Sequence, residues 1–342
     1  MFTLLLMFKN QPKRHHYLPV FYQRGFTEGM DRLWMYDRKA QKFSNASPED
    51  ICCENDMYTI DPKGQRNVRI EVKWFSKIDG DGAEAVRHFR QGHLSDEWRE
   101  AFSIFMAQQI TRTPVFRRSI MASQRIMAEE FLRLGFSDVE RARRTMEHYG
   151  DSQDTEKVSP ESMVEAVTDG HLKIEITEAP FLKHMIEHVE FLARWLHSFN
   201  WTILKAPKET GFIICDYPFV LIPPKTRLTL AGFKYPGTVM LFPIDRCMCL
   251  HMEGRGWATR FISISKGNVR LVNQNIAVNS ERFIIGPNKT QLEGIIARST
   301  TALPDTNARA TVEMVMADAD ECLIKMTFWP IRNYFYPIAP LA

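Results

Sequence analysis

Hydrophobic and polar residues alternate in short runs near the start of the chain. Leu33 to Arg38 and Asp56 to Ile60 both repeat with a period close to two, which is typical of strands. Apolar residues then recur every four positions from Ile70 to Ile78, which is helical spacing. We therefore expect short antiparallel strands, followed by a helix that the two glycines of Asp79 to Gly82 kink or divide.

Helical spacing dominates the middle of the chain. Ser95 precedes acidic residues and an apolar stripe, as a helix N-cap does, and Thr113-Pro114 ends that helix. Val115 to Tyr149 and Phe181 to Phe199 continue in helical style. The polar segment Gly150 to Ala179 between them is expected to be the most variable or mobile part.

Beyond residue 200 the pattern becomes β-like, with short apolar runs separated by Pro and Gly. These runs are residues 201–204, 212–214, 219–222, 239–242 and 247–250. Strands at both ends of the chain around a central helical region predict an α+β fold, because no regular β-α-β alternation is present. The chain reads as a single α+β domain over residues 1–342, or as two lobes, with residues 1–200 forming an N-terminal hairpin plus helices and 201–342 mainly β.

Composition narrows the class of protein. With 342 residues and 44% hydrophobic content, the chain can bury a large core. The formal charge of +3 is too small to imply nucleic acid or an anionic membrane as an obligatory partner. No apolar window approaches the length of a membrane-spanning helix, so we expect no membrane association. Six cysteines are few for this length, which predicts a protein located in the reducing cytoplasm.

The segment His15 to Phe26 reads HHYLPVFYQRGF. Its pattern His-Tyr-x-Pro-x-x-Tyr-x-x-x-Phe resembles bacterial proteins grouped as domain-of-unknown-function family 4238, and the resemblance implies no particular reaction. It continues in scattered blocks, which include Gln109 to Pro114 as Q-x-x-R-T-P and Cys215 to Pro218, where Cys215 stands in place of a serine. Within the opening, the resemblance singles out His16.

The opening offers a first set of candidate site residues. Adjacent histidines in an extended segment point to opposite sides, so only one of them is expected to face a site. His16 could bind a metal or transfer a proton, and Arg24 could clamp an anion, with Tyr17 as a further binding residue. The alternative is that His16 and Tyr17 satisfy buried hydrogen bonds.

Two acidic residues form the second candidate. Glu71 and Asp79 lie two turns apart beside an apolar stripe and could bind a divalent metal. The family resemblance implies acidic residues near both positions, although Asp79 stands where a glutamate is more usual. The alternative is a helix whose carboxylates are solvated.

Gln108 and Arg112 extend the core-facing line of the third predicted helix, and Gln109 belongs to the block that resembles the family. A buried charge needs compensation, so Arg112 either binds a substrate anion or pairs with Glu71 or Asp216. Asp216 follows an apolar strand, where it could act in catalysis or end the strand in an Asx-turn.

Together these residues suggest a metal-assisted hydrolase of a phosphodiester or nucleotide. Glu71, Asp216 and His16 would hold Mg or Mn, and Arg112 would stabilise the developing phosphate charge, so His16, Arg112 and Asp216 are the catalytic candidates. Nucleic acid or nucleotide would contact the arginine-rich stretch from Arg112 to Arg144, although solvated helix arginines are the favoured explanation of that stretch.

The alternative is a non-catalytic binding module in which the same polar residues form a buried network. An open cleft around Arg112 would favour catalysis, whereas a sealed network would favour the module. Two further patterns carry less weight. His184 to His188 matches the zinc spacing H-x-x-E-H but also lies on an apolar helix face, and the Cys247 and Cys249 pair is expected to belong to the core.

Overall fold

A computed structural model describes most of the chain. The described residues are 13–29, 31–59, 70–149, 158–171, 174, 179–223, 236–299, 309–318 and 321–329. The chain divides into two compact units, a larger one of residues 1–117, 182–307 and 330–342, and a smaller one of residues 118–181 and 308–329. The larger unit therefore uses the chain on both sides of residue 200.

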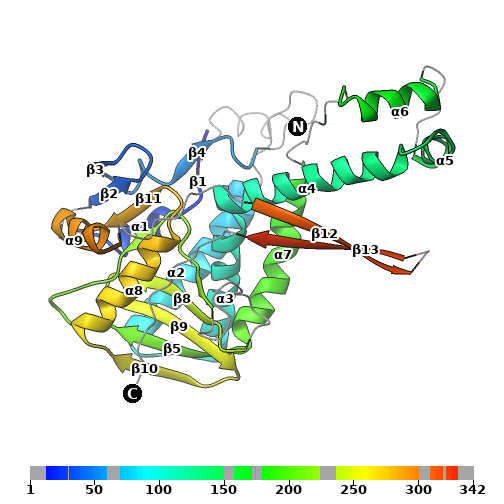
Figure 1. The fold of residues 1–342 in the computed structure, drawn as a ribbon. Helices are drawn as coiled ribbons and strands as arrows, with labels where there is room; N and C mark the ends of the chain where they lie inside the picture. Colours follow the sequence, from blue (N-terminus) through cyan, green and yellow to red (C-terminus); the bar gives the residue numbers. More distant parts are fainter. Residues whose placement is uncertain are drawn as a thin grey trace, which may run out of the picture. The chain divides into compact units, whose positions relative to one another are not determined.

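Three sheets organise the described part of the larger unit (Figure 1). A two-stranded sheet pairs β1 (Arg14–His16) with β4 (Cys53–Asn55). A four-stranded antiparallel sheet has the order β3 (Lys42–Ala46), β2 (Leu33–Asp37), β11 (Phe283–Gly286), β6 (Ile214–Cys215). A five-stranded sheet has the order β10 (Thr259–Ser263), β5 (Phe199–Lys205), β9 (Met248–Arg255), β8 (Val239–Asp245), β7 (Val220–Ile222), in which only β10 and β5 are parallel.

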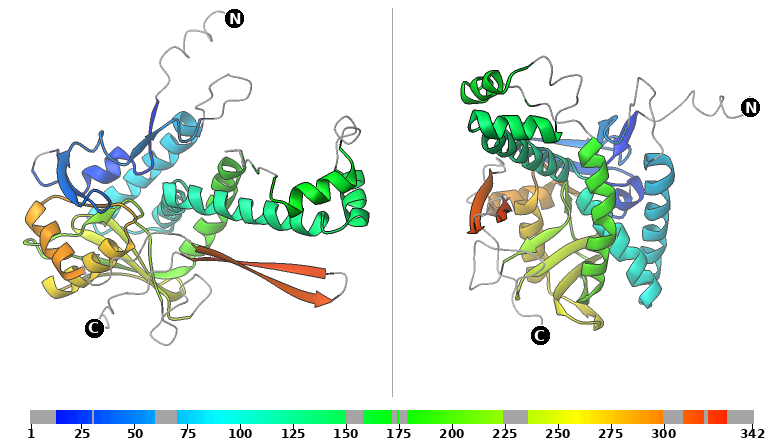
Figure 2. Two further views of the ribbon diagram at one scale, coloured as in Figure 1. Left: turned by 45° about the horizontal axis from the view of Figure 1, so that its top comes forward. Right: turned by 90° about the vertical axis from the view of Figure 1, so that its right-hand side faces the viewer.

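Helices cover these sheets. The larger unit contains α1 (Val20–Arg24), the π-helix η3 (Ile70–Phe75), α2 (Ser76–Arg90), α3 (Asp96–Thr111), most of α7 (Ala179–His197), α8 (Lys266–Asn279) and α9 (Lys289–Ser299). Figure 2 shows α2 and α3 on one side of the five-stranded sheet and α8 on the other. None of the helices in the described part of the chain is long and apolar enough to cross a membrane.

The smaller unit is built mainly from helices. It contains most of α4 (Pro114–Gly135), α5 (Val139–Tyr149), α6 (Pro160–Thr168), and the antiparallel pair β12 (Arg309–Asp318) and β13 (Glu321–Trp329). With strands near both ends and helices between them, the chain has the α+β fold that its hydrophobic pattern predicts.

The core of the larger unit lies around α3. The Ser95 side chain accepts a hydrogen bond from the backbone N–H of Trp98, which confirms the predicted cap. Phe102 and Phe105 on α3 are fully buried, and Phe102 meets Trp201 of β5 and Phe242 of β8 at ring-centroid distances of 6.2 and 5.8 Å. Because the second half of α3 is buried all round, any polar residue there must find its partners inside the protein.

Some sequence predictions are wrong. The strand expected at residues 56–60 lies earlier, at β4, and residues 56–58 form a turn in which Asp56 takes a φ of 54°; Ile60 lies outside the described residues. Helices α6, α8 and α9 were not foreseen. The expected division of the helix at Asp79 to Gly82 is also wrong, because α2 continues through both of its glycines.

Gly82 lets α2 approach α3, and this gives a test with its own control. A Cβ at Gly82 would lie 2.7 Å from two ring atoms of Phe105, whereas a Cβ at the exposed Gly80 would meet nothing within 4 Å. We expect Gly82→Ala to lower the free energy of unfolding by about 1–3 kcal/mol through overpacking. Gly80→Ala should raise it by about 0.5–1 kcal/mol through helix propensity. Urea unfolding of both variants checks the pair; equal effects would contradict the packing argument.

Candidate functional site

The opening segment enters the core through β1. Alternation along this strand buries His15 completely and leaves His16 half-buried, as expected of adjacent histidines. The Nδ1 atom of His15 accepts the backbone N–H of Tyr58 at 3.0 Å, and the two rings stack at 5.6 Å. The Nε2 atom of His16 lies 3.0 Å from the carbonyl oxygen of Glu49. A carbonyl only accepts, so Nε2 carries the proton and only Nδ1 could bind a metal. Burial lowers the pKa of His16, so its ring is neutral near pH 7.

Arg112 caps the end of α3 and is 1% exposed. Its Nε atom donates to the backbone carbonyl of Tyr17 at 2.9 Å, and its Nη1 atom contacts the two carboxylate oxygens of Asp79 at 3.1 and 3.3 Å. The guanidinium also lies 5.1 Å from the ring centroid of Phe75. Arg112 therefore ties the opening segment to α2 and α3. Of the two pairing partners suggested for it, Asp216 is not the one found: the described carboxylate partner is Asp79.

Asp79 carries the compensating charge. Its side chain is 23% exposed, and burial raises its pKa while the Arg112 guanidinium lowers it. Because both of its oxygens face Arg112, Asp79 is occupied by an ion pair.

Several polar atoms of Arg112 and its neighbours have no hydrogen-bond partner in the described part of the chain. Gln108 and Gln109 are 0% exposed. Both amide atoms of each, and the Nη2 atom of Arg112, are buried without a hydrogen-bond partner among the described residues. Most buried polar side-chain atoms in native proteins are partnered, so such a concentration within about one helical turn is unusual. We call Tyr17, Asp79, Gln108, Gln109 and Arg112 the Arg112 cluster.

Asp216 is a buried carboxylate whose charge acts on Tyr17. Its Oδ1 atom accepts the backbone N–H of Glu281 at 2.9 Å, and its Oδ2 atom accepts that of Arg282 at 2.7 Å. These bonds fix the connection between α8 and β11, so the carboxylate supports a distant loop and not the local Asx-turn considered from the sequence. The buried Tyr17 side chain is hydrogen-bonded to Cys52 and feels the charge of Asp216, while burial raises the pKa of Tyr17.

Asp216 should make stability depend on pH. Burial raises its pKa to about 6 from an ordinary 3.8, although the backbone N–H groups oppose this. The folded state therefore holds the proton more tightly, and the associated stability is present below about pH 4 and is lost as the pH rises through about 6. Relative to Asp216→Asn, we expect the wild type to lose about 2 kcal/mol between pH 4 and 7. Urea unfolding across this range measures the difference; a constant difference would contradict the raised pKa.

Glu71 belongs to the π-helix η3, directly before α2. Helices of this kind are rare and often mark functional sites. The Glu71 side chain lies outside the described residues, so its predicted role as a metal ligand stays a prediction. Within the described part of the chain, no group of three or more His, Cys, Asp or Glu side chains is arranged to hold a metal ion.

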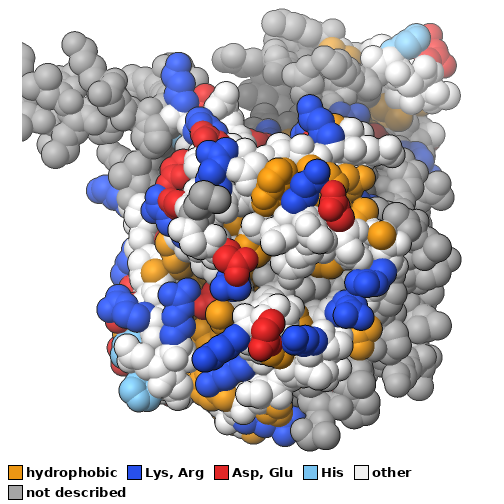
Figure 3. Space-filling model, turned by 90° about the vertical axis from the view of Figure 1, so that its left-hand side faces the viewer, with side chains coloured by type: hydrophobic (Ala, Val, Ile, Leu, Met, Phe, Trp, Pro, Cys, Tyr) orange, Lys and Arg blue, Asp and Glu red, His pale blue; other side chains and the backbone are white. Residues whose placement is uncertain are grey.

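The other sequence candidates have identifiable surroundings. Arg24 pairs with Asp31 at 3.1 Å and with Glu49. Arginines of α4 and α5 pair with acids three or four residues away in the chain, as solvated helix arginines do. These pairs join Arg133 to Glu130, Arg143 and Arg144 to Glu140, and Arg141 to Asp138, which directly precedes α5. On the face that Figure 3 shows, Lys and Arg side chains are interspersed with acidic and hydrophobic ones.

The two weaker metal-like patterns also resolve into local contacts. His188 Nδ1 lies 2.8 Å from the carbonyl oxygen of His184, one turn earlier on α7. Cys249 is buried in β9, as predicted, but Cys247 is exposed in the preceding turn, so its placement in the core was wrong. Alternation cannot begin at Cys247 because the strand begins at Met248.

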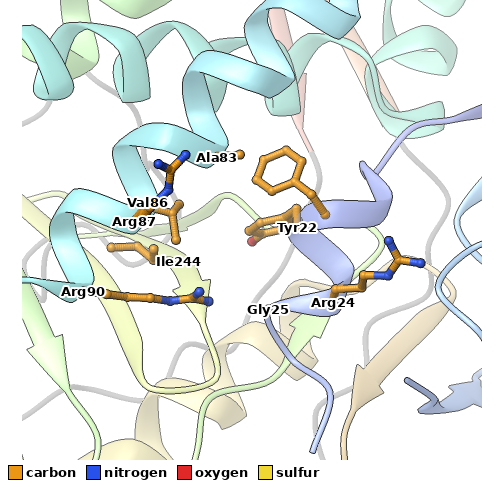
Figure 4. A pocket seen from close by; sticks show the side chains of 9 residues that line it. Tyr22, Arg24, Gly25, Ala83, Val86, Arg87, Arg90 and Ile244 are labelled. Carbon is orange, nitrogen blue, oxygen red and sulfur yellow. The ribbon is translucent and has the colours of Figure 1, made fainter. Parts of the chain in front are cut away.

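A groove of about 400 Å³ opens between α1 and α2 (Figure 4). Its lining from the opening segment is Phe21, Tyr22, Arg24 and Gly25, and its lining from elsewhere is Ala83, Val86, Arg87, Arg90 and Ile244. Sequence reasoning missed the α2 residues. The available signal was their spacing of three and four, which places them on one helix face.

The groove and the Arg112 cluster thus define a mixed α+β protein in which the opening segment, His15 to Phe26, contributes to both an open groove and a largely buried polar cluster. The family model described as "Protein of unknown function (DUF4238)" matches residues 14–290. The match covers most of the chain, so the chain belongs to this family. Comparison with curated proteins and with solved structures found no match.

Proposed function

We propose that this protein is a non-catalytic binding module in which the Arg112 cluster is a structural network. The observation that carries this proposal is burial: Arg112 is 1% exposed, and Gln108 and Gln109 are 0% exposed. A catalytic group must meet its substrate, whereas a network that pins the opening segment onto α2 and α3 works best when sealed. The contacts of Arg112 with Tyr17 and Asp79 fit that pinning role.

The occupied carboxylates support the same proposal. Asp79 faces Arg112, and both oxygens of Asp216 accept backbone N–H groups. Neither carboxylate is left with its full set of lone pairs for a divalent ion. The protonated Nε2 atom of His16, donating to a carbonyl, removes one ring nitrogen from the ligand set as well.

A metal-assisted hydrolase of a phosphodiester or nucleotide is the second candidate. The specific observation in its favour is that polar atoms of Gln108, Gln109 and Arg112 have no partner among the residues that the structure describes. These atoms could meet a substrate anion and its bound water. In this candidate His16, Glu71 and Asp216 would hold Mg or Mn, and Arg112 would stabilise the negative charge on the phosphate.

Ion-dependent melting separates the two candidates. We would measure thermal unfolding with EDTA, Mg and Mn for the wild type, Glu71→Ala and the control Glu100→Ala, which removes an exposed carboxylate of α3. In parallel, DNA, RNA and ADP would be incubated with each ion and examined for cleavage. If the protein is a binding module, the melting temperature of each protein should be the same with EDTA, Mg and Mn, and no substrate should be cleaved.

The opposite result would establish the hydrolase. A saturating ion that binds only the folded protein stabilises it by roughly 2.7 kcal/mol at one hundred times its Kd. A rise in melting temperature with Mg or Mn that Glu71→Ala abolishes and Glu100→Ala retains, together with cleavage, would overturn the binding module.

A further inference from the structure

The groove between α1 and α2 is lined by arginines and by apolar side chains. Arg87 and Arg90 come from one face of α2, together with Ala83 and Val86, and Ile244 of β8 adds an apolar contact. In Figure 4, Arg90 extends from α2 toward Gly25, the residue that caps the C-terminal end of α1. The groove therefore lies between residues of the opening segment and the arginine-bearing face of α2.

Arg90 is held in place by a buried carboxylate. Its Nε atom lies 2.7 Å from Oδ2 of Asp245, whose side chain is 4% exposed. The other oxygen of Asp245 accepts the backbone N–H groups of Cys247 and Met248 at 2.8 and 2.9 Å. Asp245 is thus fully engaged and fixes the guanidinium without turning toward the groove. The two Nη atoms of Arg90 have no hydrogen-bond partner among the described residues, and its side chain is 55% exposed.

Arg87 provides a second guanidinium one turn earlier on α2. Only its Nη2 atom is engaged among the described residues, by Glu84, and its side chain is 63% exposed. Arg24 contributes less, because Asp31 and Glu49 hold its guanidinium, which lies on the side of α1 away from α2 in Figure 4. The N–H groups of Arg87 and Arg90 that have no acceptor among the described residues can donate hydrogen bonds to the oxygens of a phosphate group.

The apolar residues of the lining suit a flat hydrophobic group. Phe21 is only half-buried, and its ring rests against Phe105 at 5.4 Å, which keeps it in place. Val86 and Ile244 extend this surface. A volume of about 400 Å³ is within the usual range for small-molecule sites.

We propose that this groove binds a phosphate ester joined to a planar aromatic group, with Arg90 and Arg87 on the phosphate and Phe21 beside the aromatic group. Asp245 is then a positioning residue for Arg90. The inference rests on the proposed function as a binding module and names its ligand class.

Calorimetric titration with ADP, pyrophosphate and adenosine tests this site on the full chain. We expect saturable binding of ADP, weaker binding of the other two probes, and about a tenfold or larger loss of ADP affinity in Arg90→Gln. The matched control is Arg194→Gln, which removes a 72% exposed, ion-paired arginine of α7. Phe21→Ala should weaken ADP binding while leaving pyrophosphate binding unchanged. Circular dichroism would show that each variant folds, and Arg87→Gln replaces Arg90→Gln if that variant does not.

The outcomes separate this inference from the proposed function. No saturable ADP binding, or equal losses in Arg90→Gln and Arg194→Gln, overturns the groove as a ligand site. Neither result contradicts the proposed binding module, which is tested separately by ion-dependent melting and cleavage. If ADP binds as expected but is hydrolysed when Mg or Mn is added, the groove stands and the non-catalytic function fails.

Discussion

Replacing Arg99 with Met is expected to lower the free energy of unfolding by about 3–5 kcal/mol. Arg99 lies on α3, is 2% exposed, and donates to oxygens of several segments. Its guanidinium also lies 4.8 Å from the ring centroid of Trp201. The acceptors are the carbonyls of His197, Phe199, Gly256 and Trp257 and the hydroxyl of Thr259. Methionine would fill the space but leave these oxygens without donors, and each unsatisfied buried group costs roughly 1–3 kcal/mol.

Arg99→Lys tests whether the shape of the donor matters. The carbonyl of His197 is at the end of α7, where a cation is favourable, so lysine retains the charge at a helix C-terminus. An ammonium has three donors and cannot reproduce the planar arrangement of the guanidinium. We expect Arg99→Lys to recover less than half of the loss, with Arg194→Met on the exposed face of α7 as the control. Urea unfolding of the three variants checks this, and full recovery with lysine would refute the geometric argument.

The second large effect is expected at Arg112. Arg112→Met should destabilise the protein by about 3–5 kcal/mol, because it leaves the Asp79 carboxylate largely buried without its cation and removes the donor to Tyr17. Adding Asp79→Leu should restore roughly 1–3 kcal/mol of that loss, since no unpaired charge then remains. A double-mutant cycle in urea isolates the interaction between the two side chains; additive effects would show that they do not stabilise each other.

The cost of Arg112→Met should also depend on pH. Burial already raises the pKa of Asp79, and loss of the guanidinium, which lowers it, raises it further. A raised folded-state pKa means that stability is present when Asp79 is protonated and is lost as the pH rises through that pKa. The gap between wild type and Arg112→Met should therefore narrow as the pH falls. A gap that stays constant would assign the loss to the Tyr17 contact and the unfilled space.

A stable double variant would also bear on function. If Arg112 is a structural pin, Arg112→Met with Asp79→Leu should retain ADP binding in the groove, because Arg90 and Asp245 lie outside the Arg112 cluster. Loss of binding in a folded double variant would instead connect the cluster to the ligand.

The sequence predicted the features that depend on neighbours along the chain. Apolar periodicity predicted α3, α4, α5 and α7, and Ser95 was identified as a cap, because caps and amphipathic faces are local properties. The alternation of side chains along an extended segment likewise predicted that His15 and His16 point to opposite sides, because this too is a local property of the chain. The HHYLPVFYQRGF opening indicated the family. By contrast, α8 was missed: it buries the polar Asn273, Gln274 and Asn275, which conceal its apolar pattern.

Tertiary structure decided every pairing over long sequence distance. Arg112 was predicted to need a partner because a buried charge must be compensated, but only the approach of α2 to α3 made that partner Asp79. The same close approach explains Gly82. From the sequence this glycine suggests a helix break, but in the structure the absence of a Cβ leaves space for the Phe105 ring. Asp216 was recognisable as a strand-end carboxylate, yet its partners lie 65 and 66 residues away. Likewise, Arg90 becomes a groove residue only because Asp245, 155 residues later, fixes its guanidinium. Local spacing determines which face of an element is apolar, while the packing of elements determines which polar groups meet there.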